Sequence, residues 1–309
     1  MLSTPSLHLL GPLIVECASG PVSLRYNKAR ALLAYLVLER GYHTRESLAY
    51  LLWPDDSPQV GRENLRRMLF LIKECLPDLI ESSREVLHVR PGAALWIDAE
   101  RFVKLIDVEE RAVAAGRQVD LGGLAQAASL HRGEFLQGMD VGDAPDFDDW
   151  MRLRREQYHR RYLRALELLV EGHEHAADLD SAIDRALAWT QAAPLDEAGW
   201  HHLLRLLVKS GQAGRATSEF ERYRRVLGQE LGTAPAPATE ALLNGGHDVD
   251  GQQDQAATVR CMFSVAGNAE VTAEPLQRLA EACEAVLRNA GARVVRLPDG
   301  SVAAYFNGH

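Results

Sequence analysis

Residues 61–73, Gly-Arg-Glu-Asn-Leu-Arg-Arg-Met-Leu-Phe-Leu-Ile-Lys, most constrain what this chain can fold into. Their apolar side chains recur at helical spacing, which predicts an amphipathic helix with one face toward a core. The core-facing positions are Leu65, Leu69, Ile72 and Leu76. The other side is mostly cationic and contains Arg62, Asn64, Arg66, Arg67 and Lys73. Arg can pair with guanine and Asn with adenine in the major groove, so these five residues are predicted DNA contacts. A solvated basic face is the alternative.

The segments around this helix have recognisable turn and cap signals. A strand-like run at 7–16, interrupted by Gly11-Pro12, and a short strand at 22–24 precede two helices, at 27–40 and 45–53. Thr44 is the expected N-cap of the second helix, Ser57-Pro58 opens the basic third helix, and Pro77-Asp78 closes it. Residues 86–90 and 95–97, joined by Pro91-Gly92, are predicted to form a β-hairpin.

Strands, three helices and a hairpin, in that order, are typical of a winged helix-turn-helix domain. We expect this domain over residues 1–104, with the basic third helix in the position that reads DNA. Arg90 is predicted at the hairpin tip and is the sixth predicted DNA contact.

The charge distribution is compatible with a DNA-binding segment. The whole chain has a formal charge of −9, but residues 1–104 hold 13 Lys and Arg against 12 Asp and Glu. The remaining residues hold 21 against 31, so the acidity lies outside the predicted DNA-binding domain. DNA binding needs a local basic surface and does not need a basic total.

Residues 105–243 are predicted to be almost entirely helical. The segments that begin at Ala182 and Ala216 are 34 residues apart, which is the tetratricopeptide repeat length. Helix ends are expected at Pro194 and near Pro235, and Trp189 and Tyr223 occupy matching repeat positions. We therefore favour stacked helix pairs, which suit protein partners, over a generic helical bundle.

Residues 244–257 are polar and glycine-rich, and we expect a flexible linker there. Residues 258–309 are predicted to form a small α/β piece with strands at 259–265, 292–297 and 301–306 and a helix at 274–289. About 50 residues bury a small core, so docking or dimerisation of this piece is expected.

Several classes of protein are disfavoured. No apolar run approaches the ~20 residues of a membrane-spanning helix, and the N-terminus has no secretory signal. The four cysteines lack metal-ligand spacing, and His173 and His175 are two apart and do not share a helix face, so no metal site is expected. The arginine run in residues 152–164 favours a solvated face over a polymerase or DNA contact. We expect reduced thiols, a cytoplasmic location, no cofactor and no enzymatic activity.

Taken together, residues 1–243 resemble the SARP-type (antibiotic-regulatory) transcriptional activators. The N-terminal 100 residues are similar to the OmpR-type winged helix, and the next 145 are similar to the bacterial transcriptional activator domain. The stretches that carry the second likeness are 130–138, 143–150, 152–156, 194–197 and 223–237. The resemblance implies a cytoplasmic activator that binds repeated half-sites of double-stranded promoter DNA as a homodimer and contacts RNA polymerase.

The last 50 residues resemble the opening of a class III nucleotide cyclase domain. The similarity lies in Val-Arg-Cys-Met-Phe at 259–263 and in the segment 291–306. Val265 stands where that family has its first metal-binding Asp, and only Asp299 fits the second. Two cations need more than one carboxylate, so we expect a degenerate regulatory or dimerising module without cyclase activity.

The sequence therefore predicts a mainly α protein: a winged helix-turn-helix, then a tetratricopeptide-like helical domain, then a small α/β fragment. The favoured function is sequence-specific DNA binding by a transcriptional activator. The alternative is a nucleotide-responsive sensor or cyclase-derived regulator whose C-terminal piece sets its activity; an effector of that kind is not identified by the sequence.

Overall fold

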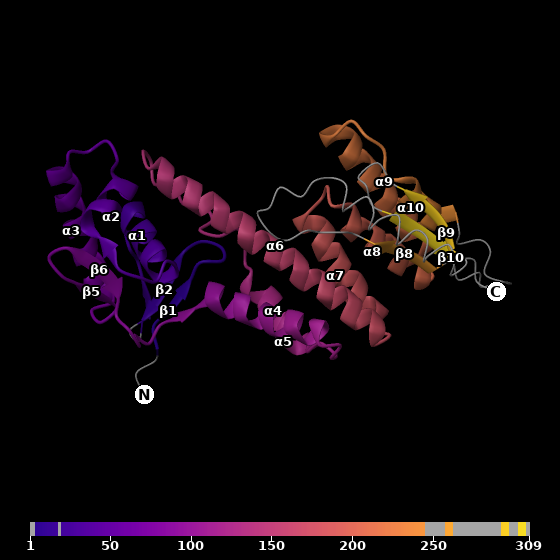
Figure 1. Ribbon diagram of the computed structural model, residues 1–309, viewed down its shortest axis with the longest axis horizontal. Coiled ribbons are helices and arrows are strands. Elements are labelled where there is room, and N and C mark those ends of the chain that lie inside the picture. The colour runs from indigo at the N-terminus through magenta and orange to yellow at the C-terminus, as the bar shows by residue number, and fades with distance from the viewer. Residues whose placement is uncertain (1–3, 18–19, 245–256, 262–291, 297–301, 307–309) are drawn as a thin grey trace, which may run out of the picture. The chain divides into compact units, whose positions relative to one another are not determined.

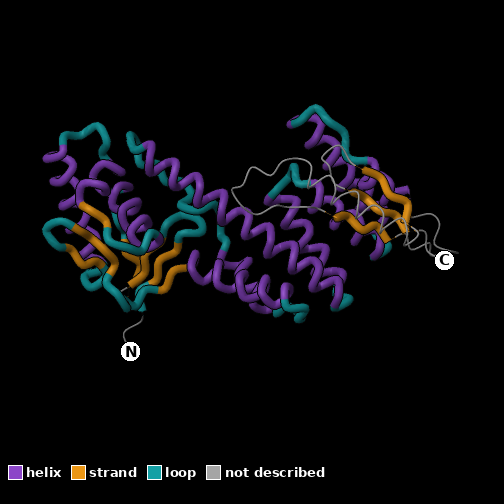
Figure 2. The backbone as a smooth tube through the Cα atoms, viewed as in Figure 1, coloured by secondary structure: helices purple, strands orange, loops and turns teal. Residues whose placement is uncertain are grey.

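The computed structural model describes residues 4–17, 20–244, 257–261, 292–296 and 302–306. The chain forms two compact units, residues 1–246 and 247–309. The first unit is mainly helical, with small sheets in its N-terminal part (Figure 2), which confirms the predicted fold class.

The N-terminal part contains two sheets and three helices. Strands β1 (Ser6–His8), β2 (Ile14–Cys17), β3 (Gly20–Val22) and β7 (Trp96–Ile97) form a sheet in the order β3-β2-β1-β7. Helices α1 (Asn27–Leu38), α2 (Arg45–Leu52) and α3 (Pro58–Cys75) come after β3 in the chain. Strands β4 (His43–Thr44), β5 (Ile80–Ser82) and β6 (Val86–Val89) form the second sheet in the order β4-β6-β5.

The predicted helix boundaries in this part are confirmed by their caps. The Thr44 side chain accepts a hydrogen bond from Ser47 N at 3.1 Å, and Ser57 accepts one from Val60 N at 3.4 Å. Each bond satisfies a backbone donor that a helix start leaves unpaired. Gly61 is buried where α3 meets α2. A side chain here would be crowded, since an added Cβ would lie only 3.3 Å from Ala49 Cβ.

The predicted hairpin between 86–90 and 95–97 is wrong. Strand β6 pairs with β5, in the register Ile80↔Val89, and with β4. Strand β7 instead pairs in parallel with β1, and Trp96 N donates to Pro5 O at 2.9 Å. The chain turns at Pro91-Gly92 as expected, but after that turn it joins a strand about 90 residues earlier in the sequence. The β5–β6 hairpin is therefore the wing of this domain.

The helical part begins with α4 (Asp98–Ala114) and α5 (Leu121–Leu130), which pack on each other and on the long helix α6 (Pro145–His175). Helix α6 runs from beside α2 to the helices that come after it in the chain (Figure 1). These are α7 (Leu179–Ala192), α8 (Glu197–Lys209), α9 (Ala213–Glu230) and α10 (Pro237–Asn244).

The predicted 34-residue period corresponds to the helix pairs α7–α8 and α9–α10. Ala182 and Ala216 are both fully buried at corresponding places in α7 and α9. Trp189 and Tyr223, about two helical turns later, are also buried. Trp200 of α8 stacks on Tyr223, with ring centroids 5.0 Å apart, and fills the core between the pairs. This arrangement fits the expected tetratricopeptide-like domain.

In the second unit, strands β8 (Ala257–Cys261), β9 (Ala292–Arg296) and β10 (Val302–Phe306) form an antiparallel sheet in the order β8-β10-β9. These strands match the three predicted there, with β8 at 257–261 where 259–265 is predicted. The predicted helix 274–289, most of the linker 244–257, and the positions Val265 and Asp299 lie outside the described residues.

Candidate nucleic-acid interface

Helix α3 is anchored by one apolar face. Gly61, Leu65, Met68, Leu69 and Ile72 are buried, and Leu76 is buried just after the helix ends, so all four predicted core positions are confirmed. Because the helix turns by 3.6 residues, Gln59, Glu63 and Phe70 then lie near the centre of the opposite, exposed face.

The five predicted contact residues on α3 do not form one face. Arg62, Arg66 and Lys73 are four and seven residues apart and share one flank of the exposed side. Arg67 and Asn64 occupy the other flank, because they are three residues apart on the far side of Glu63.

On the first flank, Arg66 is exposed and has no ion pair or hydrogen bond with any other described residue. Arg62 forms an ion pair with Glu46 of α2, in which both side chains are more than half exposed. Lys73 donates to the Ser82 hydroxyl of β5 at 2.8 Å. Exposed pairs of this kind are worth little, so these cations can exchange their partners for phosphate or bases.

On the second flank, both side chains have internal partners. Arg67 lies 5.3 Å from the ring centre of Tyr26 and donates to its hydroxyl at 3.2 Å. Asn64 Nδ2 donates to Asp56 Oδ2 at 2.9 Å, toward the loop between α2 and α3. Of the five, Arg66 is therefore the side chain whose donors are least committed within the described part of the molecule.

The wing adds cations that the sequence pattern did not identify. Arg84 is exposed in the turn between β5 and β6, and Arg45 Nε at the start of α2 donates to Ser83 O in that turn at 3.1 Å. A hollow of about 450 Å³ between α2, α3 and the wing is lined by Thr44, Arg45, Glu46, Arg62, Arg84 and Glu85. Sequence reasoning missed Arg84 because it did not predict the short strand β5, and Arg84 lies in a turn only if β5 precedes it.

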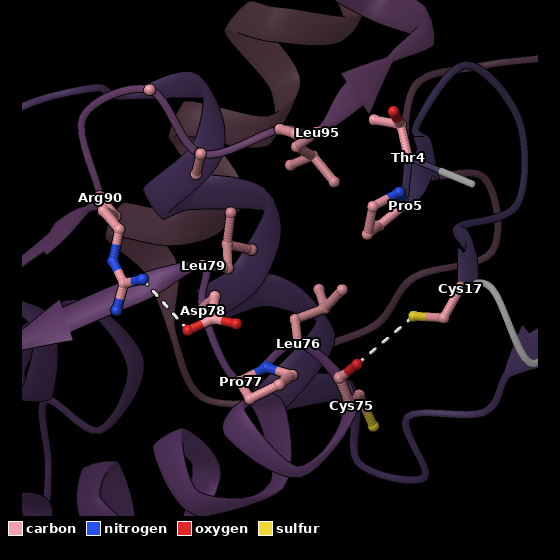
Figure 3. Close-up of a pocket in the computed structure, with 13 residues that line it drawn as sticks. Thr4, Pro5, Cys17, Cys75, Leu76, Pro77, Asp78, Leu79, Arg90 and Leu95 are labelled. Carbon is pink, nitrogen blue, oxygen red and sulfur yellow. Dashed lines mark hydrogen bonds and ion pairs between the residues drawn. The ribbon is translucent and has the colours of Figure 1, made fainter. Parts of the chain in front are cut away.

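The predicted position of Arg90 at a hairpin tip is wrong, because Arg90 comes after β6 at the base of the wing. Its guanidinium lies 3.1 Å from Asp78 Oδ1 and 3.1 Å from Glu81 Oε1. It borders a largely apolar hollow of about 600 Å³ (Figure 3), and Cys17 Sγ donates to Cys75 O at 3.4 Å on another wall of this hollow. Two carboxylates compete with phosphate for Arg90, whereas Arg62 has one such partner and Arg84 has none among the described residues, so Arg84 is the better placed to bind phosphate.

The arginine run on α6 is paired with carboxylates of this chain, and it is only in part the solvated face that the sequence favours. Arg154 forms an ion pair with Glu39 of α1, and Arg161 contacts Asp107 and Glu110 of α4 at 2.5 and 2.9 Å. The remaining pairs are Arg152–Asp149, Arg155–Glu134, Arg160–Glu156, Arg164–Glu110 and Arg164–Glu167. Arg154 and Arg161 therefore join α6 to neighbouring helices.

Residues 131–137, which we call the interdomain strap, bind the helical part to the N-terminal sheet region. Arg132 N and Leu136 N donate to Leu10 O and Leu9 O at 3.2 and 2.9 Å, and Gln137 N donates to Gly11 O at 3.0 Å. Gly11 N in turn donates to Glu134 O at 3.1 Å. Since the two segments are over 100 residues apart, these bonds fix the two parts as one compact unit.

A buried carboxylate lies beneath the strap. Asp98, at the start of α4, has no exposed surface and accepts hydrogen bonds from Leu9 N, Leu10 N and Ala99 N at 2.7, 3.0 and 2.7 Å. The guanidinium of Arg132 lies 3.6 Å away. Burial raises the pKa of Asp98, and the three N–H donors act in the opposite direction. Asp98 thus connects the first strand, α4 and the strap.

His131, at the start of the strap, is stacked on Tyr162 of α6 with ring centroids 4.0 Å apart. Burial, with a smaller contribution from the nearby His159, lowers the pKa of His131 to about 4. The ring is therefore neutral at physiological pH and acts as an aromatic packing residue.

Residues 97–245 match the model of the bacterial transcriptional activator domain family. The matched segment covers slightly less than half of the chain. It begins one residue before Asp98 and contains the strap, α6 and both helix pairs. We use the name activator domain for residues 97–245 below.

Similar proteins extend this likeness beyond the activator domain. The regulatory protein AfsR of Streptomyces coelicolor is 29% identical over 240 residues, covering 76% of this chain and 23% of AfsR. The transcriptional regulatory protein EmbR of Mycobacterium tuberculosis is 29% identical over 249 residues, covering 76% of this chain and 61% of EmbR. The chain thus spans less than two thirds of either relative.

A solved structure of Mycobacterium tuberculosis EmbR, in complex with a low affinity phosphopeptide, superimposes with a TM-score of 0.60. The likeness covers 79% of this chain and 65% of that one at 22% identity, and it supports the winged-helix and helical fold. In the described ranges no helix is long and apolar enough to cross a membrane, and no cluster of His, Cys, Asp or Glu has the make-up of a metal site.

Proposed function

We propose that this chain is a SARP-type transcription regulator that binds double-stranded promoter DNA through its N-terminal domain. Helix α3 enters the major groove, and the wing turn contacts the adjacent backbone. The observation that carries the proposal is Arg66, an exposed guanidinium on the outer side of α3 whose donors are uncommitted among the described residues. Arg62, Asn64, Arg67, Lys73 and Arg90 are the other predicted contacts, and the activator domain and the regulatory names of the relatives support this function.

The activator domain supplies the protein contacts in this proposal. Stacked helix pairs present a continuous surface for partners, and the family resemblance implies a homodimer and RNA polymerase as those partners. Sedimentation of the chain alone, with promoter DNA and with RNA polymerase measures both associations. The proposed regulator acts without catalysis, and the cyclase-like nature of the C-terminal unit is an expectation from the sequence alone.

Arg66→Ala should weaken binding to a selected DNA site by about 1–3 kcal/mol, because one base-reading guanidinium is worth that much. The measurement is a titration by fluorescence anisotropy at fixed salt. Arg160→Ala is the matched control: it removes an exposed arginine of α6 whose ion-pair partner is Glu156, four residues away, and it should leave affinity unchanged. If Arg66→Ala and the unsubstituted chain bind the selected site with equal affinity, the assignment of α3 as the DNA-reading helix is contradicted.

The wing should contribute a phosphate contact through Arg84. Arg84→Ala should lower the magnitude of the slope of log K against log salt by about 1, because one phosphate contact fewer releases fewer counterions. Arg90→Ala is the comparison, and a smaller change is expected because two carboxylates compete with phosphate for that side chain. An unchanged slope for Arg84→Ala, with a full unit lost for Arg90→Ala, would contradict this description of the wing.

A further inference from the structure

Phe70 occupies the middle of the exposed face of α3. Its side chain is 63% exposed, whereas the other phenylalanines whose burial is described, Phe102, Phe135, Phe147 and Phe220, are at most 6% exposed. Exposing an aromatic ring to water costs free energy that burial would recover. The packing of α3 does not require a large apolar residue here, because the helix is anchored by its opposite face.

The surroundings of Phe70 indicate what covers it. Arg66 and Arg67 precede it by four and three residues, and Lys73 comes three residues later, so cations lie on both sides of the ring. The carboxylates of Glu63 and Glu74 lie on the same face, and a carboxylate can accept from N4 of cytosine. An aromatic ring with cations on both sides suits the DNA major groove, whose edges carry phosphates and whose floor presents thymine methyl groups.

We propose that Phe70 makes thymine a specificity determinant of this protein by packing against the C5-methyl group in the DNA major groove. That methyl group is the one apolar feature that a base pair presents there, and aromatic side chains contact it. The proposal rests on the proposed DNA-binding function and goes beyond it, since it names the base and the atom that one residue recognises.

The test uses the full chain and DNA selected by it from a random pool. Each thymine of the selected site is replaced in turn by deoxyuridine, which keeps base pairing and lacks only the methyl group. At one or more positions the unsubstituted chain should lose affinity by about fourfold, the factor for one buried methyl group. Phe70→Ala should bind the thymine site at least as weakly as the unsubstituted chain binds the uracil site, and replacing thymine by uracil should not change its affinity further.

Two controls accompany this cycle. Phe70→Leu keeps an apolar side chain and should keep part of the thymine preference. Val60→Ala truncates another exposed apolar residue of α3, 43% exposed near its start, and should keep all of it. Phe70→Ala should melt as the unsubstituted chain does, because an exposed ring contributes little to the core.

The possible results separate the two proposals. If no DNA sequence is enriched, the proposed function itself fails. If a sequence is enriched but uracil is tolerated everywhere, DNA binding stands and the role of Phe70 is overturned. A thymine effect that persists in Phe70→Ala assigns the methyl contact to another residue. A lower sedimenting mass for Phe70→Ala assigns the ring to a contact between copies, which also overturns the proposal.

Discussion

Replacing Asp98 by Ala is expected to lower the free energy of unfolding by about 3–5 kcal/mol, the range for breaking a buried, hydrogen-bonded charge. The change leaves the N–H groups of Leu9, Leu10 and Ala99 without their acceptor inside the protein. Each unsatisfied buried donor costs roughly 1–3 kcal/mol. It also takes the carboxylate away from Arg132, 3.6 Å distant. Urea denaturation monitored by circular dichroism measures the difference.

Glu100→Ala is the matched control for this prediction. Glu100 lies two residues further along α4, is 45% exposed and pairs with Arg40 at 2.9 Å. An exposed pair contributes about 0–1 kcal/mol, so the control should change stability little. Asp98→Asn should lie between the two, because it keeps one acceptor oxygen. A loss no larger for Asp98→Ala than for Glu100→Ala would show that the buried carboxylate does not hold the domains together.

The second large effect is a dependence of stability on pH through His131. Its pKa is about 4 in the folded chain because of burial and, secondarily, repulsion from His159. An unfolded histidine titrates near 6.5. Between these values the unfolded chain binds the proton more readily, so the free energy of unfolding falls as pH decreases from about 6.5 to 4. The loss is about 1.4 kcal/mol per pH unit and roughly 3 kcal/mol in total.

His131→Phe isolates this contribution. Phenylalanine keeps an aromatic ring against Tyr162 and cannot be protonated. As the pH falls below about 6.5, the variant should therefore lose less stability than the unsubstituted chain. His175→Phe changes an exposed histidine at the end of α6 and should keep the original profile. Parallel curves for His131→Phe and the unsubstituted chain between neutral pH and about pH 4 would mean that His131 does not titrate in this range.

Local signals account for the parts of the fold that the sequence predicted well. Helix α3 arises from its apolar period, and Thr44 and Ser57 cap helices where the residue types indicate. The 34-residue spacing of Ala182 and Ala216 works because both small residues occupy the same close-packed position in their helix pairs.

Non-local pairing accounts for what the sequence did not predict. Strand β7 has two residues, and its partner β1 lies near the chain start, so no local pattern could assign it. The wing strand β5 has only three residues and begins soon after Pro77-Asp78, which indicates a helix end and a loop, so the sequence did not predict a strand there. Helical spacing already separates Asn64 from Arg66 on α3, but the bond from Asn64 to Asp56 depends on how the loop before the helix folds.

The strap has a consequence for the modularity of this chain. Its backbone bonds pair the polar groups of Leu9, Leu10 and Gly11, just after β1, with residues that the activator domain supplies. A fragment cut near residue 104 keeps Asp98 but loses Arg132, and it leaves these backbone groups of Leu9, Leu10 and Gly11 without their partners inside the protein. The N-terminal domain is thus not independent of the activator domain: a fragment that ends after Gln137 should be more stable than one that ends near residue 104, because it keeps these contacts.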